Sequence, residues 1–298
     1  MKVAVFGISG YLGIELVKIL SQRKDTEIVY TATSKEKRGE LKNASVALLA
    51  LPANESLHLV PELLLSGIKV IDLSGAYRLK NPDSYPRYYG WRHPYPELLT
   101  EAVYGLPENN RDNIRKARLI ANPGCYATAI NLGLLPLVRD GLISKSTKVV
   151  VKAVSGYTGA GKGAKIPKTI TPYKGGRQHQ HIPEIEQELE IENQLLFYPQ
   201  VAPWPRGIEV LIRSKISAVT DIVSFYKAHY SREVFIRVES ENITVDKVVK
   251  TNFCDILPAY KGSFATVKVA IDNLVKGGAG QAIQNLNIIS GLSDNVGL

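Results

Sequence analysis

The fold is decided by the N-terminal stretch Lys2-Val3-Ala4-Val5-Phe6-Gly7-Ile8-Ser9-Gly10-Tyr11-Leu12-Gly13. Residues 2–6 form a short apolar run typical of a buried strand, and residues 11–20 place leucine and isoleucine at helical spacing. A strand, a glycine turn and a helix in this order predict a dinucleotide site, because the helix N-terminus can hold a pyrophosphate. The glycines at 7, 10 and 13 differ from the G-x-G-x-x-G spacing, so an ordinary tight turn is the alternative.

The rest of the chain alternates between strand-like and helix-like segments. Short apolar runs separated by polar or helical stretches predict a parallel α/β sheet, and they lie at residues 27–31, 46–51, 70–73 and 119–121. A helix is expected at 125–138, followed by longer alternating strands at 148–154, 209–216 and 263–271 and a helix at 221–230. We predict an α/β protein with a Rossmann-like domain at 1–124 and 276–298. The α+β substrate domain takes 125–275, and the C-terminal helix returns to the first domain.

Composition excludes several classes of protein. The 298 residues are 45% hydrophobic and 22% charged, as in a soluble enzyme. The net charge of +9 is spread along the chain without a basic-aromatic run, so phosphorylated small molecules are favoured over nucleic acid. The two cysteines lie far apart, which disfavours disulfides and metal clusters and indicates a reducing, cytoplasmic location. Apolar runs are too short to cross a membrane.

A basic segment follows the second expected strand. An NAD site usually carries an acid here for the ribose hydroxyl, whereas this chain reads Thr33-Ser34-Lys35-Glu36-Lys37-Arg38. Ser34, Lys35 and Arg38 would instead complement the 2'-phosphate of NADP. The alternative is a solvated basic loop.

A candidate nucleophile stands at a strand-to-helix junction, in Asn122-Pro123-Gly124-Cys125. Unsatisfied N–H groups at a helix start favour a thiolate at Cys125 and could also hold an oxyanion. A lone cysteine is more often a small buried core residue, and that is the interpretation for Cys254.

Two histidines are candidate acid/base groups. His179 and His181 stand just before an expected helix, and Glu184 could orient one of the two rings. A zinc site is disfavoured because no further ligand cluster accompanies them, and no metal is expected.

Anionic substrate contacts are expected from a glycine-rich loop and two arginines. The loop at 155–162 begins with Ser155 and Gly156, and Gly163 after Lys162 departs from the P-loop pattern. Arg78 and Arg206 could clamp phosphate or carboxylate, although a single arginine is more often a surface ion-pair residue.

Taken together, the motifs resemble the N-acetyl-gamma-glutamyl-phosphate reductases, which are related to the aspartate-semialdehyde dehydrogenases. The resemblance runs nearly end to end and rests on the segments 7–13, 122–126, 155–156, 179–187 and 276–282. It implies that Cys125 is the nucleophile, that the paired histidines supply the acid/base, and that the turn at 277–282 lines the nicotinamide pocket. It also implies a homodimer or homotetramer built through the second domain.

The expected sites can be stated residue by residue. The catalytic residues are Cys125, His179, His181 and Glu184. The residues expected to bind NADP are Gly7, Ser9, Gly10, Tyr11, Leu12, Gly13, Ser34, Lys35, Arg38, Gly277, Gly278, Ala279 and Gly280. The residues expected to bind the acyl-phosphate substrate are Arg78, Asn122, Ser155, Gly156 and Arg206.

The resemblance implies reduction of N-acetyl-gamma-glutamyl phosphate to the semialdehyde in arginine biosynthesis, through a thioester that NADPH reduces. Two departures stand out: the stretch between Arg38 and Val46 is shorter than in the family, and Trp204-Pro205 replaces its usual Met-Asn pair. The alternatives are a reductase of carrier-linked aminoadipyl phosphate in lysine biosynthesis, a non-catalytic NADP-binding regulator, and a cysteine hydrolase.

Overall fold

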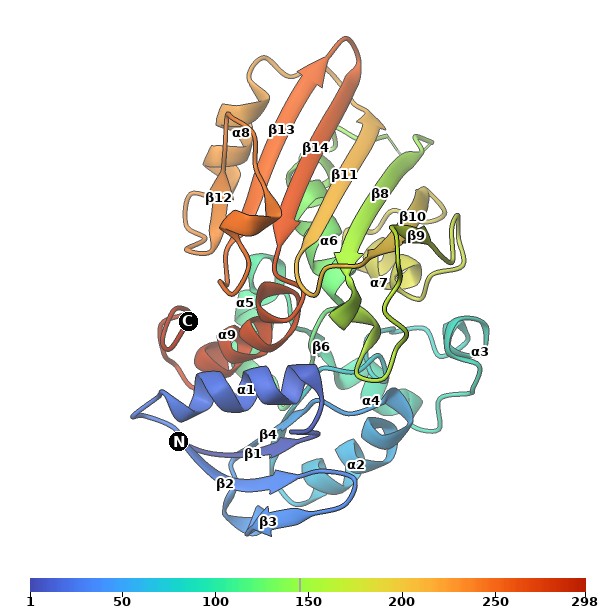
Figure 1. Ribbon diagram of the computed structural model, residues 1–298. Helices are drawn as coiled ribbons and strands as arrows, with labels where there is room; N and C mark the ends of the chain where they lie inside the picture. Colours follow the sequence, from blue (N-terminus) through green and yellow to red (C-terminus); the bar gives the residue numbers. More distant parts are fainter. Residues whose placement is uncertain (145) are drawn as a thin grey trace. The chain divides into compact units, whose positions relative to one another are not determined.

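The computed structural model describes residues 1–144 and 146–298. The chain divides into two compact units, one formed by Met1–Gly124 with Gly278–Leu298 and the other by Cys125–Gly277. Each unit is built on a seven-stranded sheet with helices packed against it (Figure 1).

The sheet of the first unit has the strand order β3-β2-β1-β4-β5-β7-β6. Its strands are β1 (Lys2–Phe6), β2 (Glu27–Ala32), β3 (Lys37–Gly39), β4 (Val46–Leu49), β5 (Lys69–Asp72), β6 (Val103–Tyr104) and β7 (Leu119–Ala121). All neighbouring strands pair in parallel except β2 and β3, which form an antiparallel hairpin. The expected parallel sheet is confirmed. The edge strand β3 was not predicted, because three exposed residues show no apolar alternation.

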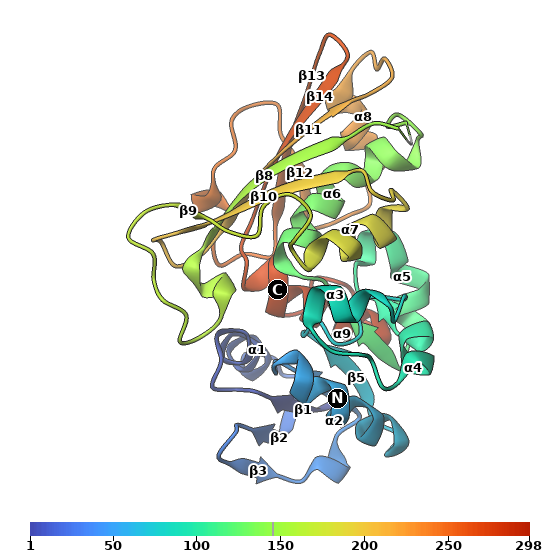
Figure 2. The same ribbon diagram turned by 90° about the vertical axis from the view of Figure 1, so that its right-hand side faces the viewer.

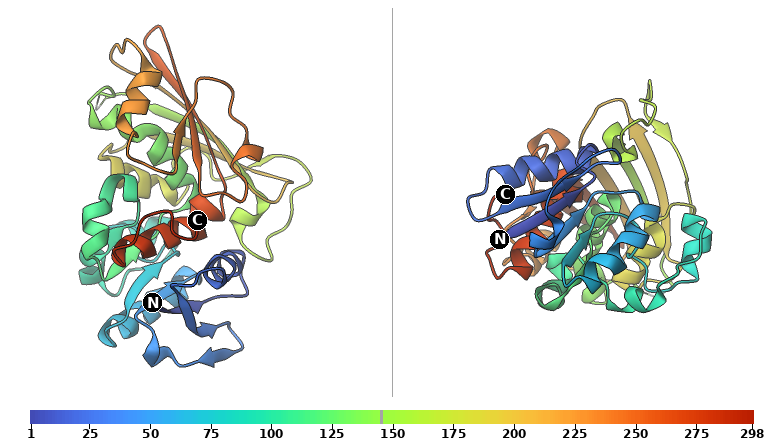
Figure 3. Two further views of the ribbon diagram at one scale, coloured as in Figure 1. Left: turned by 90° about the vertical axis from the view of Figure 1, so that its left-hand side faces the viewer. Right: turned by 90° about the horizontal axis from the view of Figure 1, so that it is seen from below.

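Helices cover both faces of this sheet (Figure 3). They are α1 (Tyr11–Ser21), α2 (Ala53–Leu65), α3 (Ser84–Tyr89), α4 (Pro96–Glu101), α5 (Pro107–Lys116) and α9 (Gly280–Ile289), with a short 3-10 turn η1 (Leu41–Asn43). Val3 and Val5 of β1 pack in one core with α1, α5 and α9, whereas Ala4 and Phe6 pack in the opposite core with α2. Because both faces of β1 are buried from Val3 onward, residues 3–6 are continuously apolar.

The sheet of the second unit is mixed, with the order β12-β13-β14-β11-β8-β10-β9. Its strands are β8 (Val149–Gly156), β9 (Thr171–Pro172), β10 (Leu195–Ala202), β11 (Ile208–Lys215), β12 (Ile236–Val238), β13 (Cys254–Lys261) and β14 (Phe264–Ile271). The other elements are α6 (Cys125–Arg139), α7 (His181–Leu189), α8 (Ile222–His229), the 3-10 helices η2 (Tyr157–Ala160) and η3 (Val245–Lys247), and the short π-helix η4 (Val275–Ala279).

One face of this sheet carries the helices. α6 packs against β11 and β14 through Gly133, where an added Cβ would lie 2.6 Å from an Ile212 methyl carbon. α6 and α7 lie on the same side of the sheet (Figure 2). The other face presents outward side chains of neighbouring strands, among them Tyr198, Leu211 and Phe264, each about two-fifths exposed.

Among the described residues, no helix is both long and apolar enough to cross a membrane.

Candidate active site

The glycine turn of the first unit lies at the carboxyl end of β1. Gly7 has a φ of +76°, and an added Cβ would lie 2.2 Å from the carbonyl oxygen of Ala50. An added Cβ on Gly13 would lie 2.1 Å from the carbonyl oxygen of Gly7. Glycine is therefore required at both positions by close backbone packing. The same packing directs the first turn of α1, which carries no acidic residue and no side-chain cap, toward this sheet edge.

The N–H groups in the first turn of α1 can donate hydrogen bonds to an anion. The first helical hydrogen bond of α1 runs from Ile14 N–H to the carbonyl oxygen of Gly10. The N–H groups of residues 11–13 therefore have no partner within the helix, and the positive end of the helix dipole lies beside them. This arrangement suits a pyrophosphate.

The basic segment forms the turn between β2 and β3. The Thr33 hydroxyl accepts the N–H groups of Lys35 and Glu36, which shapes the turn. Ser34 and Lys35 are exposed on this turn, and Arg38 is exposed on β3. Arg38 Nε donates to Glu36 Oε1 at 2.8 Å, and this contact raises the pKa of Arg38 above its ordinary value. The contribution of these side chains to NADP binding stays a prediction.

Asn122 ties several segments of the first unit together. Its N–H donates to the carbonyl oxygen of Asp72, and its Nδ2 donates to the carbonyl oxygen of Gly278 at 3.2 Å. Its Oδ1 accepts from Asn285 Nδ2 at 3.1 Å. Both ends of the side chain are thus engaged within the protein, so the contacts indicate a role in shaping the loop that leads to Cys125.

Arg78 also contacts this loop. Its Nε donates to the carbonyl oxygen of Asn122, and its Nη2 donates to that of Leu73, each at 2.8 Å. The guanidinium is buried near Asp72, whose carboxyl pKa is raised by burial. Substrate contacts of Arg78 and Asn122 stay predictions. The two Arg78 hydrogen bonds described above both go to main-chain carbonyl oxygens.

Cys125 is the first residue of α6 and is partly exposed. Gly277 packs directly against it: an added Cβ on Gly277 would lie 2.9 Å from the Cβ of Cys125. Cys254, in contrast, is fully buried, as expected of a core residue.

His179 and His181 lie edge to face, with ring centroids 4.6 Å apart. The Nδ1 of His179 accepts the N–H of His181 at 3.1 Å, so the proton of the neutral His179 ring is on Nε2. Burial, assisted by the neighbouring His181 and Lys174, lowers the pKa of His179 to about 2, although the fully buried Glu184 opposes this shift. His179 is therefore neutral near pH 7.

Two tyrosines that sequence reasoning missed lie in the same cluster. The Tyr126 ring packs against both imidazoles, at centroid distances of 5.8 Å to His179 and 6.1 Å to His181. Its hydroxyl is in hydrogen-bond contact with Tyr173 and Ser155 and donates to the carbonyl oxygen of Gln200. Burial raises the pKa of the Tyr173 hydroxyl to about 12, and the charge of Cys125 contributes. Tyr126 could have been found from its place beside Cys125, whereas Tyr173 carries no local signal.

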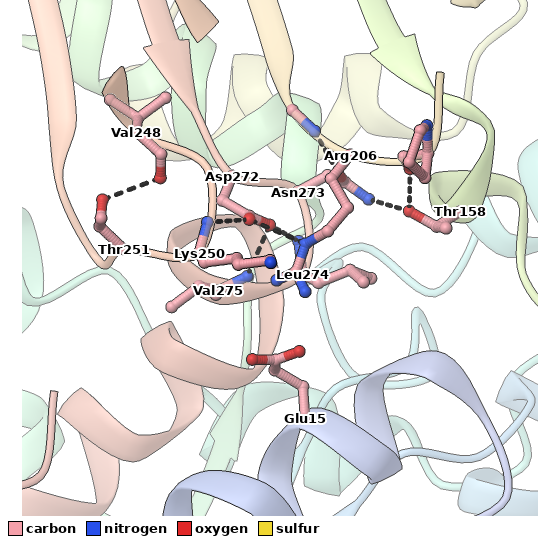
Figure 4. Close-up of polar contacts among 12 residues, drawn as sticks. Glu15, Thr158, Arg206, Val248, Lys250, Thr251, Asp272, Asn273, Leu274 and Val275 are labelled. Atoms are coloured by element: carbon pink, nitrogen blue, oxygen red, sulfur yellow. Dashed lines mark hydrogen bonds and ion pairs between the residues drawn. The ribbon is translucent and has the colours of Figure 1, made fainter. Parts of the chain in front are cut away.

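Arg206 is held by a buried carboxylate. Its Nε donates to Asp272 Oδ2 at 2.9 Å, and the Asp272 side chain is fully buried (Figure 4). The expected loop at 155–162 is instead the end of β8 followed by η2. The turn that carries Arg206 is joined to it, because Gly156 N–H donates to the carbonyl oxygen of Gly207 and Tyr157 N–H donates to that of Trp204. Ser155, Gly156 and Arg206 are therefore brought together.

The division of the chain also divides the predicted site. The second unit contains Cys125, Ser155, Gly156, His179, His181, Glu184, Arg206 and Gly277. The first unit contains the residues of the glycine turn and the β2–β3 turn, together with Arg78, Asn122, Gly278, Ala279 and Gly280.

Comparison with known proteins defines the class first. Residues 36–117 match the family described as semialdehyde dehydrogenase, NAD binding domain, and residues 125–273 match the semialdehyde dehydrogenase, dimerisation domain. The fold is shared with an aspartate semialdehyde dehydrogenase of Vibrio cholerae, with a TM-score of 0.72 at 16% identity over 97% of this chain and 98% of that one. It is also shared with the Candida albicans enzyme solved with NADP, with a TM-score of 0.71 at 14% identity over 99% of each chain.

Curated relatives narrow the class to one family. An N-acetyl-gamma-glutamyl-phosphate reductase of Bacillus cereus is 38% identical, and one of a Geobacter species is 37% identical. Each match covers all of this chain and 98% of the relative. The chain belongs to the N-acetyl-gamma-glutamyl-phosphate reductase family.

Proposed function

We propose that this protein is an NADP-dependent reductase that converts N-acetyl-gamma-glutamyl phosphate to N-acetylglutamate semialdehyde in arginine biosynthesis. Full-length identity to named reductases supports the substrate. The observation that carries the chemistry is the cluster of Cys125, Tyr126 and the two histidines around the start of α6. It combines a partly exposed thiol with a nearby acid/base.

The first unit fits NADP. Close backbone packing at Gly7 and Gly13 holds the start of α1 against the end of β1, and the first turn of α1 offers N–H groups to a pyrophosphate. Exposed Lys35 and Arg38 at the β2–β3 turn supply positive charge for a 2'-phosphate. NADPH, when bound, supplies the hydride that reduces the thioester.

In the acylation step, the Cys125 thiolate attacks the acyl carbon, the new carbon–sulfur bond forms, and inorganic phosphate leaves with the electrons of the broken carbon–oxygen bond. N–H groups at the start of α6 hold the negative oxygen that develops on that carbon. After reduction, the thiohemiacetal collapses to the aldehyde and the carbon–sulfur bond returns its electrons to Cys125. His181 gives a proton to the oxygen of the thiohemiacetal as it forms and takes that proton back when the thiohemiacetal collapses.

We assign the acid/base role to His181 because His179 is poorly suited to it. The pKa of His179 is depressed to about 2, and its Nδ1 is occupied by the N–H of His181. His179 then acts as a neutral ring that fixes the start of α7 and packs against Tyr126. Glu184 contributes negative charge near the pair.

The reverse reaction tests the proposal. NADPH formation is followed with N-acetylglutamate semialdehyde, NADP and inorganic phosphate, for wild type, Cys125→Ser and Cys254→Ser. We expect phosphate-dependent turnover that Cys125→Ser abolishes and Cys254→Ser retains in its folded fraction. Absence of turnover in a folded protein that binds NADP would refute the substrate assignment, and absence of NADP binding would refute the reductase class.

A second candidate function is favoured by one observation. The segment 161–176 contains no acidic residue, and its four lysines, Lys162, Lys165, Lys168 and Lys174, are exposed. An acidic carrier protein bearing an aminoadipyl phosphate would find complementary charge there. The same assay with carrier-linked semialdehyde decides between the two, because a carrier-dependent enzyme shows much higher kcat/KM for the linked substrate and loses it at high salt.

We also propose a homo-oligomer, a dimer or tetramer, built through the second unit. The residues that match a dimerisation domain include β8, β10, β11 and β14, whose outward face exposes apolar side chains. Leu211→Glu places a charge on this face, and light scattering should then show smaller particles than wild type. An unchanged mass would contradict the assignment. A cytoplasmic location is proposed as well, to be checked by cell fractionation.

A further inference from the structure

A buried polar network in the second unit is centred on Asp272 and includes Arg206 and Asn273 (Figure 4). Asp272 follows the last residue of β14 and is fully buried. Its Oδ2 accepts from Arg206 Nε at 2.9 Å and from Lys250 N–H at 2.6 Å. Its Oδ1 accepts from Leu274 N–H at 2.7 Å and Val275 N–H at 3.2 Å. One carboxylate therefore holds three chain segments.

The neighbouring Asn273 extends the polar network toward η2. Its Oδ1 accepts Gly207 N–H at 2.7 Å, and its Nδ2 donates to Thr158 Oγ1 at 2.9 Å. Thr158 Oγ1 in turn donates to the carbonyl oxygen of Pro205. Both sides of the Arg206 turn are thus fixed, one by Asp272 and the other by Asn273.

The main chain of Asp272 connects the polar network to Cys125. Its carbonyl oxygen accepts Gly277 N–H at 2.8 Å, and the Gly277 α-carbon packs against Cys125. A second set of contacts runs from Cys125 to Arg206 through the end of β8. The Ser155 hydroxyl contacts Tyr126, the neighbour of Cys125, and an added Cβ on Gly156 would lie 2.6 Å from Arg206 N. Cys125 and Arg206 are consequently linked through Asp272 in one direction and through Ser155–Gly156 in the other.

We propose that Asp272 is a positioning residue that sets the Arg206 guanidinium, as the anchor for the anionic end of the substrate, relative to the Cys125 thiol. The Asp272 carboxylate holds the Nε edge of the Arg206 guanidinium. The main-chain carbonyl oxygen of Asp272 holds Gly277, which packs against Cys125. Both carboxylate oxygens of Asp272 accept from protein donors, so in this proposal Asp272 acts through Arg206 and does not itself contact the substrate. This inference rests on the proposed function, because the anion is the substrate's.

The Asp272 side chain is fully buried and the Arg206 side chain is 15% exposed, and removing such charges from water is costly, which argues that this pair is kept for orientation. A buried Arg–Asp pair is weak evidence for stability, since an apolar replacement can be as stable. A planar guanidinium held at one edge by a carboxylate loses little further freedom when it binds an anion. The expected signature of losing Asp272 is therefore weaker substrate binding with unchanged NADP binding.

The test compares wild type, Asp272→Asn, Arg206→Lys and the double variant. Asn273→Ala is the matched control in the same polar network. KM for the semialdehyde, KM for NADP, kcat and Tm are measured. We expect Asp272→Asn to raise KM for the semialdehyde at least tenfold with KM for NADP within twofold. In the Asp272→Asn background, Arg206→Lys should add much less than it does in wild type. Asn273→Ala should lower Tm with a smaller change in KM.

Additive effects of the two substitutions, or a fall in Tm without a change in KM, would overturn the proposal. Asp272 accepts four N–H groups, so Asp272→Asn is also checked for folding. If it does not fold, Asp272→Glu, which keeps the charge but moves the carboxylate, replaces it, and the same rise in KM for the semialdehyde is expected. Failure of both variants to fold would make Asp272 a stability residue and would also overturn it.

A second readout separates this inference from the proposed function. Alkylation of Cys125 by iodoacetamide requires no turnover, and we expect N-acetylglutamate to slow it in wild type but not in Asp272→Asn. Protection in wild type without turnover would contradict the proposed reaction while leaving the positioning role supported. Equal protection in wild type and Asp272→Asn would refute the positioning role.

Discussion

Gly277 lies against Cys125 so closely that a methyl group on Gly277 would stand 2.9 Å from the Cys125 Cβ and 3.2 Å from its Cα. The N–H of Gly277 is held by the carbonyl oxygen of Asp272 at 2.8 Å. The glycine therefore has little room to withdraw, and the position of the nucleophile depends on a residue 152 positions away in the sequence, by the numbering.

Gly277→Ala should push α6 away at its first residue. We expect kcat to fall about 10- to 100-fold, since small displacements of reacting groups have effects of that size. Overpacking should also cost about 1–3 kcal/mol in the free energy of unfolding, measured by urea denaturation. Gly175→Ala is the control, because its Cβ would meet Tyr198 at 3.5 Å, an ordinary contact. Wild-type kcat in Gly277→Ala would contradict the packing argument.

His179 should make the protein less stable in mild acid. Its pKa is depressed in the folded state, so below about pH 6.5 the unfolded chain binds a proton that the folded protein does not. The free energy of unfolding should then fall by about 1.4 kcal/mol per pH unit below that point through this group alone. His179→Asn retains an acceptor for His181 N–H and removes the titration. Denaturation at pH 7.5, 6.0 and 5.0 should therefore show a shallower decline in the variant; parallel declines would contradict the assignment.

Asn285→Leu should loosen the loop that precedes the nucleophile. Asn285 Nδ2 donates to the carbonyl oxygen of Gly105 at 2.9 Å and to Asn122 Oδ1 at 3.1 Å. Losing these bonds in a buried place should cost about 1–3 kcal/mol in unfolding free energy. We also expect a lower kcat. The control is Gln284→Ala on the same helix, whose amide donates to Asp294 and which should lose stability but keep kcat. Equal kcat in both variants would separate Asn285 from the site.

Arg38→Ala should weaken NADP more than NAD. If the exposed guanidinium meets the 2'-phosphate, its loss removes a charge-assisted hydrogen bond worth about 1.5–3 kcal/mol, or about 10- to 100-fold in KM for NADP. KM for NAD should change little. Arg115→Ala, which removes another exposed ion-paired arginine of the first unit, should leave both values unchanged. A parallel rise in both KM values would place Arg38 outside the phosphate site.

Local sequence was sufficient for the elements whose pattern is strong. The helix expected at 125–138 spans Cys125–Arg139, and the strands expected at 209–216 and 263–271 span Ile208–Lys215 and Phe264–Ile271. These segments alternate or repeat with the period of the structure that they form. The short strands β3, β6, β9 and β12 have two or three residues each, too few to show any period.

The sequence by itself determined the family, the dinucleotide-type turn and the candidate residues at Cys125, His179 and His181, because each depends on neighbours within a few positions. Only the tertiary structure decided that Tyr173, Asp272 and Asn273 support the same region, and that Asn122 is engaged from both ends of its side chain. Those contacts join residues far apart in the chain. Sheet register and helix packing create them, and no local pattern of residues encodes which distant partners meet.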